Sequence, residues 1–385
     1  MDTQSDNSWI GRRSLLGALP LATALGACRP DAPPAAEAHG KGVERPAQGV
    51  VESVGERQPG VDHPAQPQTH AVVSVYDLPL RDGVARVAAR MGRTVLELTE
   101  NPGGFLGVEL GDLTVTVGLG PRLVGSAGQA LSGGLELPAF ARERRTARAW
   151  GGDLLVQVCA SDPVVAALAD TRLAASLAAE GASGRWSQAG FRPPGGGPVR
   201  NLLGFPDGIE NPGTRTELDH EVWLDGPGPF GGGTIAVVRR LRIDVNGFLA
   251  QSRTRQEEAI GRRKADGAPL SGGDGRARLD LSAKTPRGRY LVPAMAHARR
   301  ANPNATGSGR MLRRGYSYRN GPDDQGLLFV SFQRALRTFV ATQRRLDDGD
   351  DLMRFVTATA SAAFFVPPAF SAEWPLGERV LGERG

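Results

Sequence analysis

Three separated segments carry side chains whose types and spacing could do chemistry, and the first of them contains Asp207. This residue stands between Gly204 and Gly208 in the sequence Gly-Phe-Pro-Asp-Gly-Ile-Glu-Asn-Pro. Glycines let the backbone approach a ligand closely or adopt a positive φ, so an Asp between them can turn its carboxylate into a pocket. Taken alone, however, the segment favours an ordinary Asp-Gly turn.

The second segment contains one of the five histidines of the chain, which are His39, His63, His70, His220 and His297. The first three lie in a low-complexity N-terminal stretch, so only His220 and His297 remain as metal ligands in the folded body. This scarcity argues against a multi-histidine site, whereas a haem iron needs only one protein ligand. On its own, His297 in Ala-His-Ala-Arg-Arg-Ala-Asn-Pro is also typical of a polar surface histidine.

The third segment begins with Arg313 and Arg314 in Arg-Arg-Gly-Tyr-Ser-Tyr. An arginine beside an iron site can stabilise a developing oxyanion without losing its own charge. In a chain with 46 Lys and Arg residues, a solvent-exposed arginine pair is the simpler interpretation of this segment.

The composition excludes several classes of protein. The chain has 385 residues, a net charge of +5 and scattered arginines, so it predicts no nucleic-acid-binding patch. Its two cysteines, Cys28 and Cys159, exclude a disulfide framework and a cysteine-rich zinc site.

The N-terminus resembles a leader of the twin-arginine (Tat) type over residues 1–28. Arg12 and Arg13 precede a mildly apolar run from Leu15 to Ala27. That run is too short for a membrane-spanning helix, which needs about 20 residues, and it fits the apolar region of a signal peptide. We therefore expect the Tat translocase as a partner and an exported protein in the periplasm, the cell envelope or the medium. A chance arginine pair is the alternative.

The leader leaves two processing outcomes open. Leu25 to Cys28 resembles a lipobox, which would place a lipid anchor on Cys28, whereas the small residues before and at Ala24 fit ordinary cleavage. Because Tat export carries folded proteins, the leader also favours a cofactor inserted before export. Residues 29–69 are rich in Pro, Ala, Gly, Glu and Gln and predict a flexible linker.

The body predicts two α+β halves over residues 70–200 and 201–385. In the first half we expect strands over residues 71–76, 113–118 and 153–159 and helices over residues 82–91 and 163–179, the latter with Asp162 as N-cap. In the second half we expect strands over residues 234–238, 316–318 and 327–332 and helices over residues 255–263 and 334–346. This repeated order approaches the ferredoxin-like β-α-β-β-α-β pattern.

Together the three segments, in this order, resemble the dye-decolourising peroxidase family, and most closely its Tat-exported branch with the deferrochelatase-type proteins. Further segments agree, among them Arg185 to Gln188, Asn201 to Leu203 and Gly326 to Phe332. The resemblance extends from about His70 to Pro368. It implies an α+β fold of two ferredoxin-like halves with antiparallel sheets and a haem b in the second half.

The resemblance also implies roles for individual residues. His297 would be the proximal haem ligand, Asp207 the distal acid-base residue and Arg313 the distal arginine. Gly204 and Gly208 would flank the haem site. Arg239 and Arg240 would lie near a haem propionate, and Leu328 and Phe329 would line the distal pocket.

One position departs from the family pattern. Members of the family often carry an acidic residue in a C-terminal helix, and the alignment places Arg354 there. That carboxylate can orient the proximal histidine, so its role would be lost unless Asp350 or Asp351 substitutes.

The implied activity is the reduction of hydrogen peroxide with one-electron oxidation of bulky aromatic or dye-like donors. Asp207 would transfer the proton and Arg313 would stabilise the developing charge. Candidate electron relays, each also explained by packing, are Trp186, Trp223, Tyr290, Tyr316 and Tyr318. A haem-processing protein of iron acquisition and a cofactor-free binding module remain as alternatives, and a homo-oligomer is compatible with the sequence.

Overall fold

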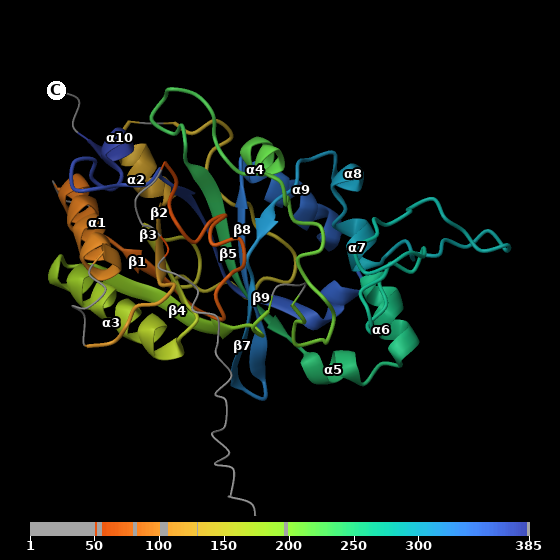
Figure 1. The fold of residues 1–385 in the computed structure, drawn as a ribbon. Helices are drawn as coiled ribbons and strands as arrows, with labels where there is room; N and C mark the ends of the chain where they lie inside the picture. Colours follow the sequence, from red (N-terminus) through yellow and green to blue (C-terminus); the bar gives the residue numbers. More distant parts are fainter. Residues whose placement is uncertain are drawn as a thin grey trace, which may run out of the picture. The chain divides into compact units, whose positions relative to one another are not determined.

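The computed structural model describes residue 51 and residues 56–79, 83–100, 107–128, 130–195 and 199–382 (Figure 1). The predicted leader, with Arg12, Arg13 and Cys28, lies outside the described residues, as does the beginning of the predicted linker. Among the residues that the structure describes, no helix is long and apolar enough to cross a membrane.

The first half is a four-stranded antiparallel sheet with two long helices on one face (Figure 1). Along the chain it contains β1 (His70–Asp77), α1 (Val84–Glu100), β2 (Thr114–Leu119), the short α2 (Pro121–Ser126), β3 (Leu154–Ala160), α3 (Pro163–Ala179) and β4 (Ser183–Phe191). The strand order β2-β3-β1-β4 is that of a ferredoxin-like sheet.

Local chemistry explains how α3 begins. The side chain of Asp162 accepts a hydrogen bond of 2.7 Å from the backbone N–H of Val164, and Pro163 occupies the first helical turn. The first backbone N–H groups of a helix have no partner within the helix. Asp162 accepts from one of them, and Pro163 has no N–H group to leave unpaired. The predicted N-cap is therefore confirmed. The strand β4 was not predicted, and it completes the β-α-β-β-α-β order.

The second half repeats this arrangement with longer connections. Its sheet is made of β9 (Val356–Val366), β5 (Thr234–Ile243), β8 (Asp324–Gln333) and β7 (Tyr316–Gly321), in that order, with β6 (Leu312–Arg313) paired to β8. The helix α9 (Leu336–Asp347) contacts β5 and β8. Shorter elements are α4 (Arg215–Glu221), α5 (Val245–Leu249), α6 (Arg253–Ile260), α7 (His297–Arg300), α8 (Pro303–Thr306), η1 (Leu352–Phe355) and α10 (Glu378–Leu381). The strand β9 was also not predicted.

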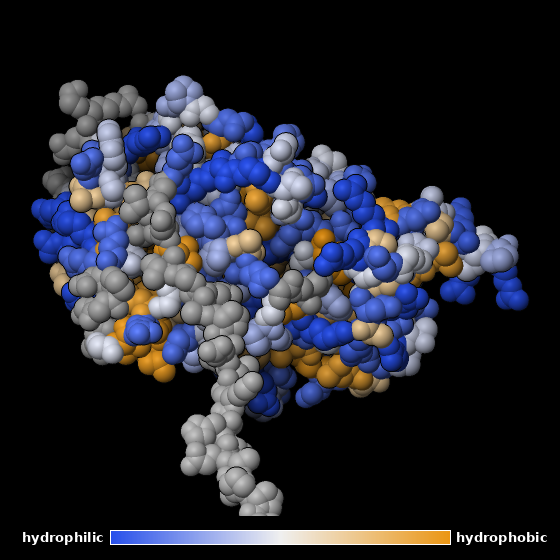
Figure 2. All heavy atoms as spheres, in the orientation of Figure 1, coloured by the Kyte–Doolittle hydropathy of each residue, from blue (hydrophilic) through white to orange (hydrophobic). Residues whose placement is uncertain are grey.

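The two sheets are joined at both edges. Leu119 of β2 pairs with Phe365 of β9, and Phe191 of β4 pairs with Ser317 of β7. A hydrophobic core with residues from both sheets, including Val73, Val238 and Phe364, lies between them. The apolar side chains of α1 and α3 contribute to a second core. On the face drawn in Figure 2, hydrophilic residues predominate and hydrophobic ones form smaller areas.

Ordered structure begins before His70, in contrast to the predicted linker. Within the described part of that linker, Gln58, Val61 and Gln68 are completely buried. Gln58 donates to the carbonyls of Val117 and Pro367, both at 3.0 Å, and accepts from the N–H of Val117. The prediction of flexibility is wrong for this part, because buried glutamines that form hydrogen bonds can hold a polar segment against the body.

Candidate functional site

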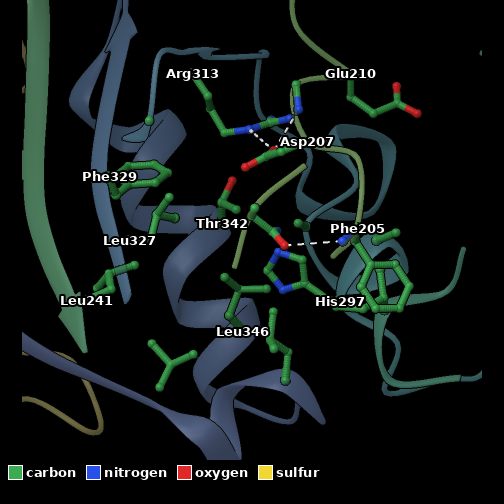
Figure 3. Close-up of a pocket in the computed structure, with 18 of the residues that line it drawn as sticks. Phe205, Asp207, Glu210, Leu241, His297, Arg313, Leu327, Phe329, Thr342 and Leu346 are labelled. Atoms are coloured by element: carbon green, nitrogen blue, oxygen red, sulfur yellow. Dashed lines mark hydrogen bonds and ion pairs between the residues drawn. The ribbon is translucent and has the colours of Figure 1, made fainter. Parts of the chain in front are cut away.

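A cavity in the second half collects the chemically active side chains (Figure 3). Its walls come from the loop that precedes α4, from β5, β8 and α9, and from the segments around α7 and η1. Most of its lining is apolar, with Leu203, Leu241, Ile260, Leu327, Phe329, Phe339, Leu346, Met353 and Val356 among the lining residues. A few polar groups converge on this apolar space, as is typical of cofactor sites.

His297 is the first residue of α7 and lies on one side of the cavity. Its Nδ1 atom is 2.7 Å from Oδ2 of Asp350, whose side chain is fully buried. The other carboxylate oxygen of Asp350 accepts from the N–H groups of Leu352 and Met353. Since a carboxylate accepts, Nδ1 carries the proton, and Nε2 is the nitrogen left to bind a metal.

The electrostatics of this pair favour an electron-rich imidazole. Burial acts to lower the pKa of His297, but the charge of Asp350 and its hydrogen bond act in the opposite direction, and the pKa lies above its ordinary value. Arg354, which the alignment places where the family often has an acidic residue, is 67% exposed and pairs with Asp351 at 3.2 Å. Asp350, one of the two substitutes considered, holds the histidine.

Asp207 and Arg313 lie together across the cavity from His297 (Figure 3). Nε of Arg313 is 4.0 Å from Oδ1 of Asp207, and that oxygen accepts a 2.6 Å hydrogen bond from the N–H of Gly208. Gly208 has a φ of 82° and Gly204 a φ of 83°, a region that favours glycine. The glycines therefore set the turn that presents the carboxylate, although Gly204 itself does not line the cavity.

Asn211 fixes the position of Arg313. Its side-chain oxygen accepts from the backbone N–H of Arg313 at 3.1 Å, and its side-chain nitrogen donates to the Arg313 carbonyl at 2.8 Å. This pair of bonds ties the loop that carries Asp207 to β6. Asn211 belongs to the quoted Asp207 segment, but the sequence did not indicate this role.

Adjacent arginines of β5 point in opposite directions because side chains alternate along a strand. Arg239 lines the cavity, where it is almost completely buried and donates to Glu143 at 2.7 Å and Gln343 at 2.8 Å. Arg240 does not line it and instead pairs with Asp324 on the other face. The prediction that both lie at the cofactor is wrong for Arg240.

The same alternation corrects a second prediction. Phe329 lines the cavity as expected, together with Leu327, whereas Leu328 is buried in the core between the two sheets. Thr342, Gln343 and Leu346 of α9 also line the cavity and were not foreseen. Thr342 and Gln343 lie four and three residues before Leu346, which places all three on one side of the helix, and this spacing was the available signal.

The remaining aromatic and histidine candidates lie elsewhere. The side chain of His220 is 79% exposed on α4 and does not line the cavity. Trp223, Tyr316 and Tyr318 are buried, whereas Tyr290 is exposed. None of the five proposed relay residues lines the cavity.

The donor set fits a haem. One imidazole has its Nδ1 fixed and its Nε2 available, and the apolar walls suit a macrocycle. Nε of Arg239, buried at the cavity, has no hydrogen-bond partner among the described residues, so one N–H donor of this guanidinium is available for a polar group of the cofactor, while its charge is paired with Glu143. In the described part of the chain, no cluster of three or more His, Cys, Asp or Glu side chains offers a different metal site.

Comparison with known families agrees with this donor set. The family model described as "Dyp-type peroxidase, N-terminal" matches residues 103–192. The model described as "Dyp-type peroxidase, C-terminal" matches residues 198–371. The first match covers β2, β3 and β4 of the first sheet but not β1, and the second covers the whole sheet of the second half with His297, Asp350, Asp207 and Arg313.

Individual relatives extend the similarity over most of the chain. A dye-decolorizing peroxidase of Thermobifida fusca is 32% identical, with 91% of this chain and 90% of that protein covered. A deferrochelatase of Yersinia pestis is 33% identical over 69% of this chain and 66% of its own length. The crystal structure of a DyP-type peroxidase from Streptomyces coelicolor has a TM-score of 0.81 and 33% identity, and covers 88% of this chain and 98% of its own.

Proposed function

The chain belongs to the Dyp-type peroxidase family, and we propose that His297, Asp207 and Arg313 form the centre of its reaction. It is a haem peroxidase: it reduces hydrogen peroxide at the expense of an electron donor. The observation that supports this assignment of residues is their arrangement, with the imidazole on one side of the cavity and the carboxylate and guanidinium on the other (Figure 3).

His297 holds the cofactor and Asp350 is its positioning residue. When bound, the haem supplies the iron that transfers electrons from the donor to peroxide. The fully buried carboxylate of Asp350 keeps the proton on Nδ1 and the ring in one orientation, so that Nε2 faces the metal. Arg239 is placed to bind a carboxylate of the cofactor.

Asp207 acts as the acid-base group. Its carboxylate would accept the proton from one oxygen of hydrogen peroxide and return it to the other, which leaves as water. Two electrons from the donor and two further protons reduce the remaining oxygen to a second water. The N–H of Gly208 holds one carboxylate oxygen in place, and the second oxygen remains available for the substrate. Arg313, fixed by Asn211, stabilises the negative charge that develops while the O–O bond breaks.

Bulky aromatic donors transfer electrons from the surface in this proposal. We propose that a dye does not enter the side of the cavity that carries Asp207 and Arg313, so that one-electron steps through the protein are required. Tyr290 is 45% exposed and could contact a donor directly, whereas Trp223, Tyr316 and Tyr318 are buried and could act only as inner relays.

The test is a rapid-mixing absorption experiment on protein purified from haem-supplied cells. We expect a haem spectrum that changes on addition of one equivalent of peroxide and returns when an aromatic donor is added. Haem that binds without any peroxide-dependent change would contradict the peroxidase assignment of these residues.

A haem-processing role is the second candidate, because deferrochelatases are among the relatives. Release of iron would convert the haem to a fluorescent metal-free porphyrin. Porphyrin fluorescence after incubation with haem, in the absence of peroxide turnover, would favour this role over the peroxidase.

We also propose that the protein is exported by the Tat translocase. The support is the sequence of residues 1–28, with Arg12 and Arg13 before a short apolar run and Cys28 at its end. Export of a folded protein fits a cofactor that is inserted in the cytoplasm. A lipid anchor at Cys28 and assembly into a homo-oligomer are further hypotheses that fractionation and light scattering would test.

A further inference from the structure

A second cavity adjoins the side of the site that carries Asp207 and Arg313. It shares those two residues with the first cavity, together with Gly208, Ile209 and Gly315. The rest of its lining comes from residues far apart in the sequence, including Gln66, Arg192, Val199, Arg276 and Arg314. Of these additional residues, the mechanism proposed above uses only Asn211, which fixes Arg313.

The lining of this second cavity is strongly cationic. It contains four arginines, Arg192, Arg276, Arg313 and Arg314, and a single carboxylate, that of Asp207. Asp207 already lies beside Arg313. The other three arginines therefore lack a carboxylate partner within the cavity wall.

Arg314 is the least expected of these residues because it is only 2% exposed. Its Nη1 donates to the carbonyl of Pro64 at 2.8 Å. Its Nε and Nη2 are buried and have no hydrogen-bond partner among the described residues. A buried guanidinium with two unpaired nitrogens is costly, because Asp62 acts on Arg314 only through its charge and no described carboxylate forms an ion pair or hydrogen bond with it.

Arg192 acts on Arg314 through its charge and is half-buried. Its guanidinium is 5.8 Å from the ring centre of Tyr316, and its side chain has no hydrogen bond or ion pair with any part of the chain that the structure describes. Burial lowers the pKa of Arg192 and that of Arg314, and the charge of Arg192 lowers the pKa of Arg314 further. Arg192 and Arg314 thus both line the second cavity, and the only carboxylate in its described lining is that of Asp207.

We propose that this cavity binds a small oxyanion, with Arg314 as the buried anchor and Arg192 as the second cation. The free Nε and Nη2 of a guanidinium form a planar fork that matches two oxygens of a phosphate, sulfate or carboxylate group. Such an anion would neutralise the excess charge beside Asp207 and Arg313 without occupying the cavity of His297. The site stands on the geometry of these arginines and does not depend on the peroxidase mechanism.

Calorimetric titration of the haem-loaded protein with inorganic phosphate at constant ionic strength tests the proposal. We expect one site, and a weakening of binding of about tenfold or more in Arg192→Gln and in Arg314→Lys, because each loses a charge-assisted hydrogen bond or its fork geometry. Arg319→Gln is the matched control, since it removes an exposed arginine of β7 that does not line the cavity. Sulfate and acetate titrations distinguish a tetrahedral oxyanion from a carboxylate as the preferred ligand.

Two further readouts separate this site from the cofactor site. The haem absorption spectrum should stay unchanged during the phosphate titration, and phosphate should raise the melting temperature of the wild type but not of Arg192→Gln. Equal binding in wild type and both variants, no binding at all, or a spectral shift that shows phosphate at the haem would overturn the proposal. Arg192 is only half-buried, so we expect Arg192→Gln to fold. That variant therefore tests the proposal even if Arg314→Lys does not fold.

Discussion

His297 and Asp350 are 53 positions apart in the chain, yet Nδ1 of the imidazole lies 2.7 Å from Oδ2 of the carboxylate. Two backbone N–H groups, those of Leu352 and Met353, hold the other carboxylate oxygen. Asp350 therefore orients His297, and the backbone at the start of η1 in turn holds Asp350 in place. This relationship determines which ring nitrogen is available for a metal.

The first prediction concerns Asp350. Asp350→Asn keeps the shape but replaces an anionic acceptor by a neutral one, so the imidazole becomes a weaker donor. We expect the protein to retain haem, the reduction potential of the iron to rise, and peroxide reactivity to fall about 10–100-fold. Spectroelectrochemistry and stopped-flow absorption measure both. Asp351→Asn is the control, because the side chain of Asp351 pairs with the exposed Arg354 and with no other side chain in the described part of the chain. Similar shifts in both variants would refute the role of Asp350.

The second prediction concerns the ligand. His297→Ala removes the one imidazole at the cavity and should abolish haem binding or change its spectrum to another ligation state. His220→Ala, which alters an exposed histidine on α4, should leave haem content and spectrum unchanged. Haem content is measured by the pyridine haemochrome absorbance per mole of protein. A normal spectrum in His297→Ala would transfer the ligand assignment to another residue.

The third prediction separates Asp207 from Arg313. Asp207→Asn removes the base while Asn can still accept the hydrogen bond of Gly208, so the second-order rate with peroxide should fall by ~10²–10⁴. Arg313→Leu removes the charge and should also slow this step. The decisive measurement is the peroxide-dependent spectral change in both variants under equal conditions. A wild-type rate in Asp207→Asn would leave Asp207 as a structural turn residue.

The fourth prediction uses two neighbours on β8. Leu328 is fully buried between the sheets, so Leu328→Ala should lower the free energy of unfolding by about 2–5 kcal/mol and leave the haem spectrum unchanged. Leu327 lines the cofactor cavity, so Leu327→Ala should instead alter haem affinity or spectrum. Denaturant unfolding and haem titration of both variants check this. Interchanged effects would mean that β8 has the opposite orientation.

The fifth prediction concerns export. Replacing both leader arginines, Arg12→Lys with Arg13→Lys, should leave a folded, haem-loaded precursor in the cytoplasm, because the Tat translocase recognises the arginine pair. Cell fractionation with haem absorbance in each fraction measures the distribution. Unchanged export of the double variant would indicate a route for unfolded chains.

The sequence alone determined the features that depend on local chemistry or on composition. Asp162 and Pro163 predicted the start of α3, and the structure shows the expected cap. The scarcity of histidine left few candidates for a ligand, and of these only His297 lines the cavity. The glycines around Asp207 predicted a special turn, and both adopt a positive φ.

Tertiary structure decided which of two adjacent residues faces the cavity. Arg239 and Leu327 line it while Arg240 and Leu328 do not, and no hydropathy pattern in β5 or β8 reveals this. A strand buried on both faces shows a continuous apolar run rather than an alternation, so its orientation is invisible in the sequence. The burial of Gln58 and the contact of Asp350 with His297 join segments far apart in the chain. Such contacts exist only after the two sheets have paired at their edges, because that pairing sets which distant side chains meet.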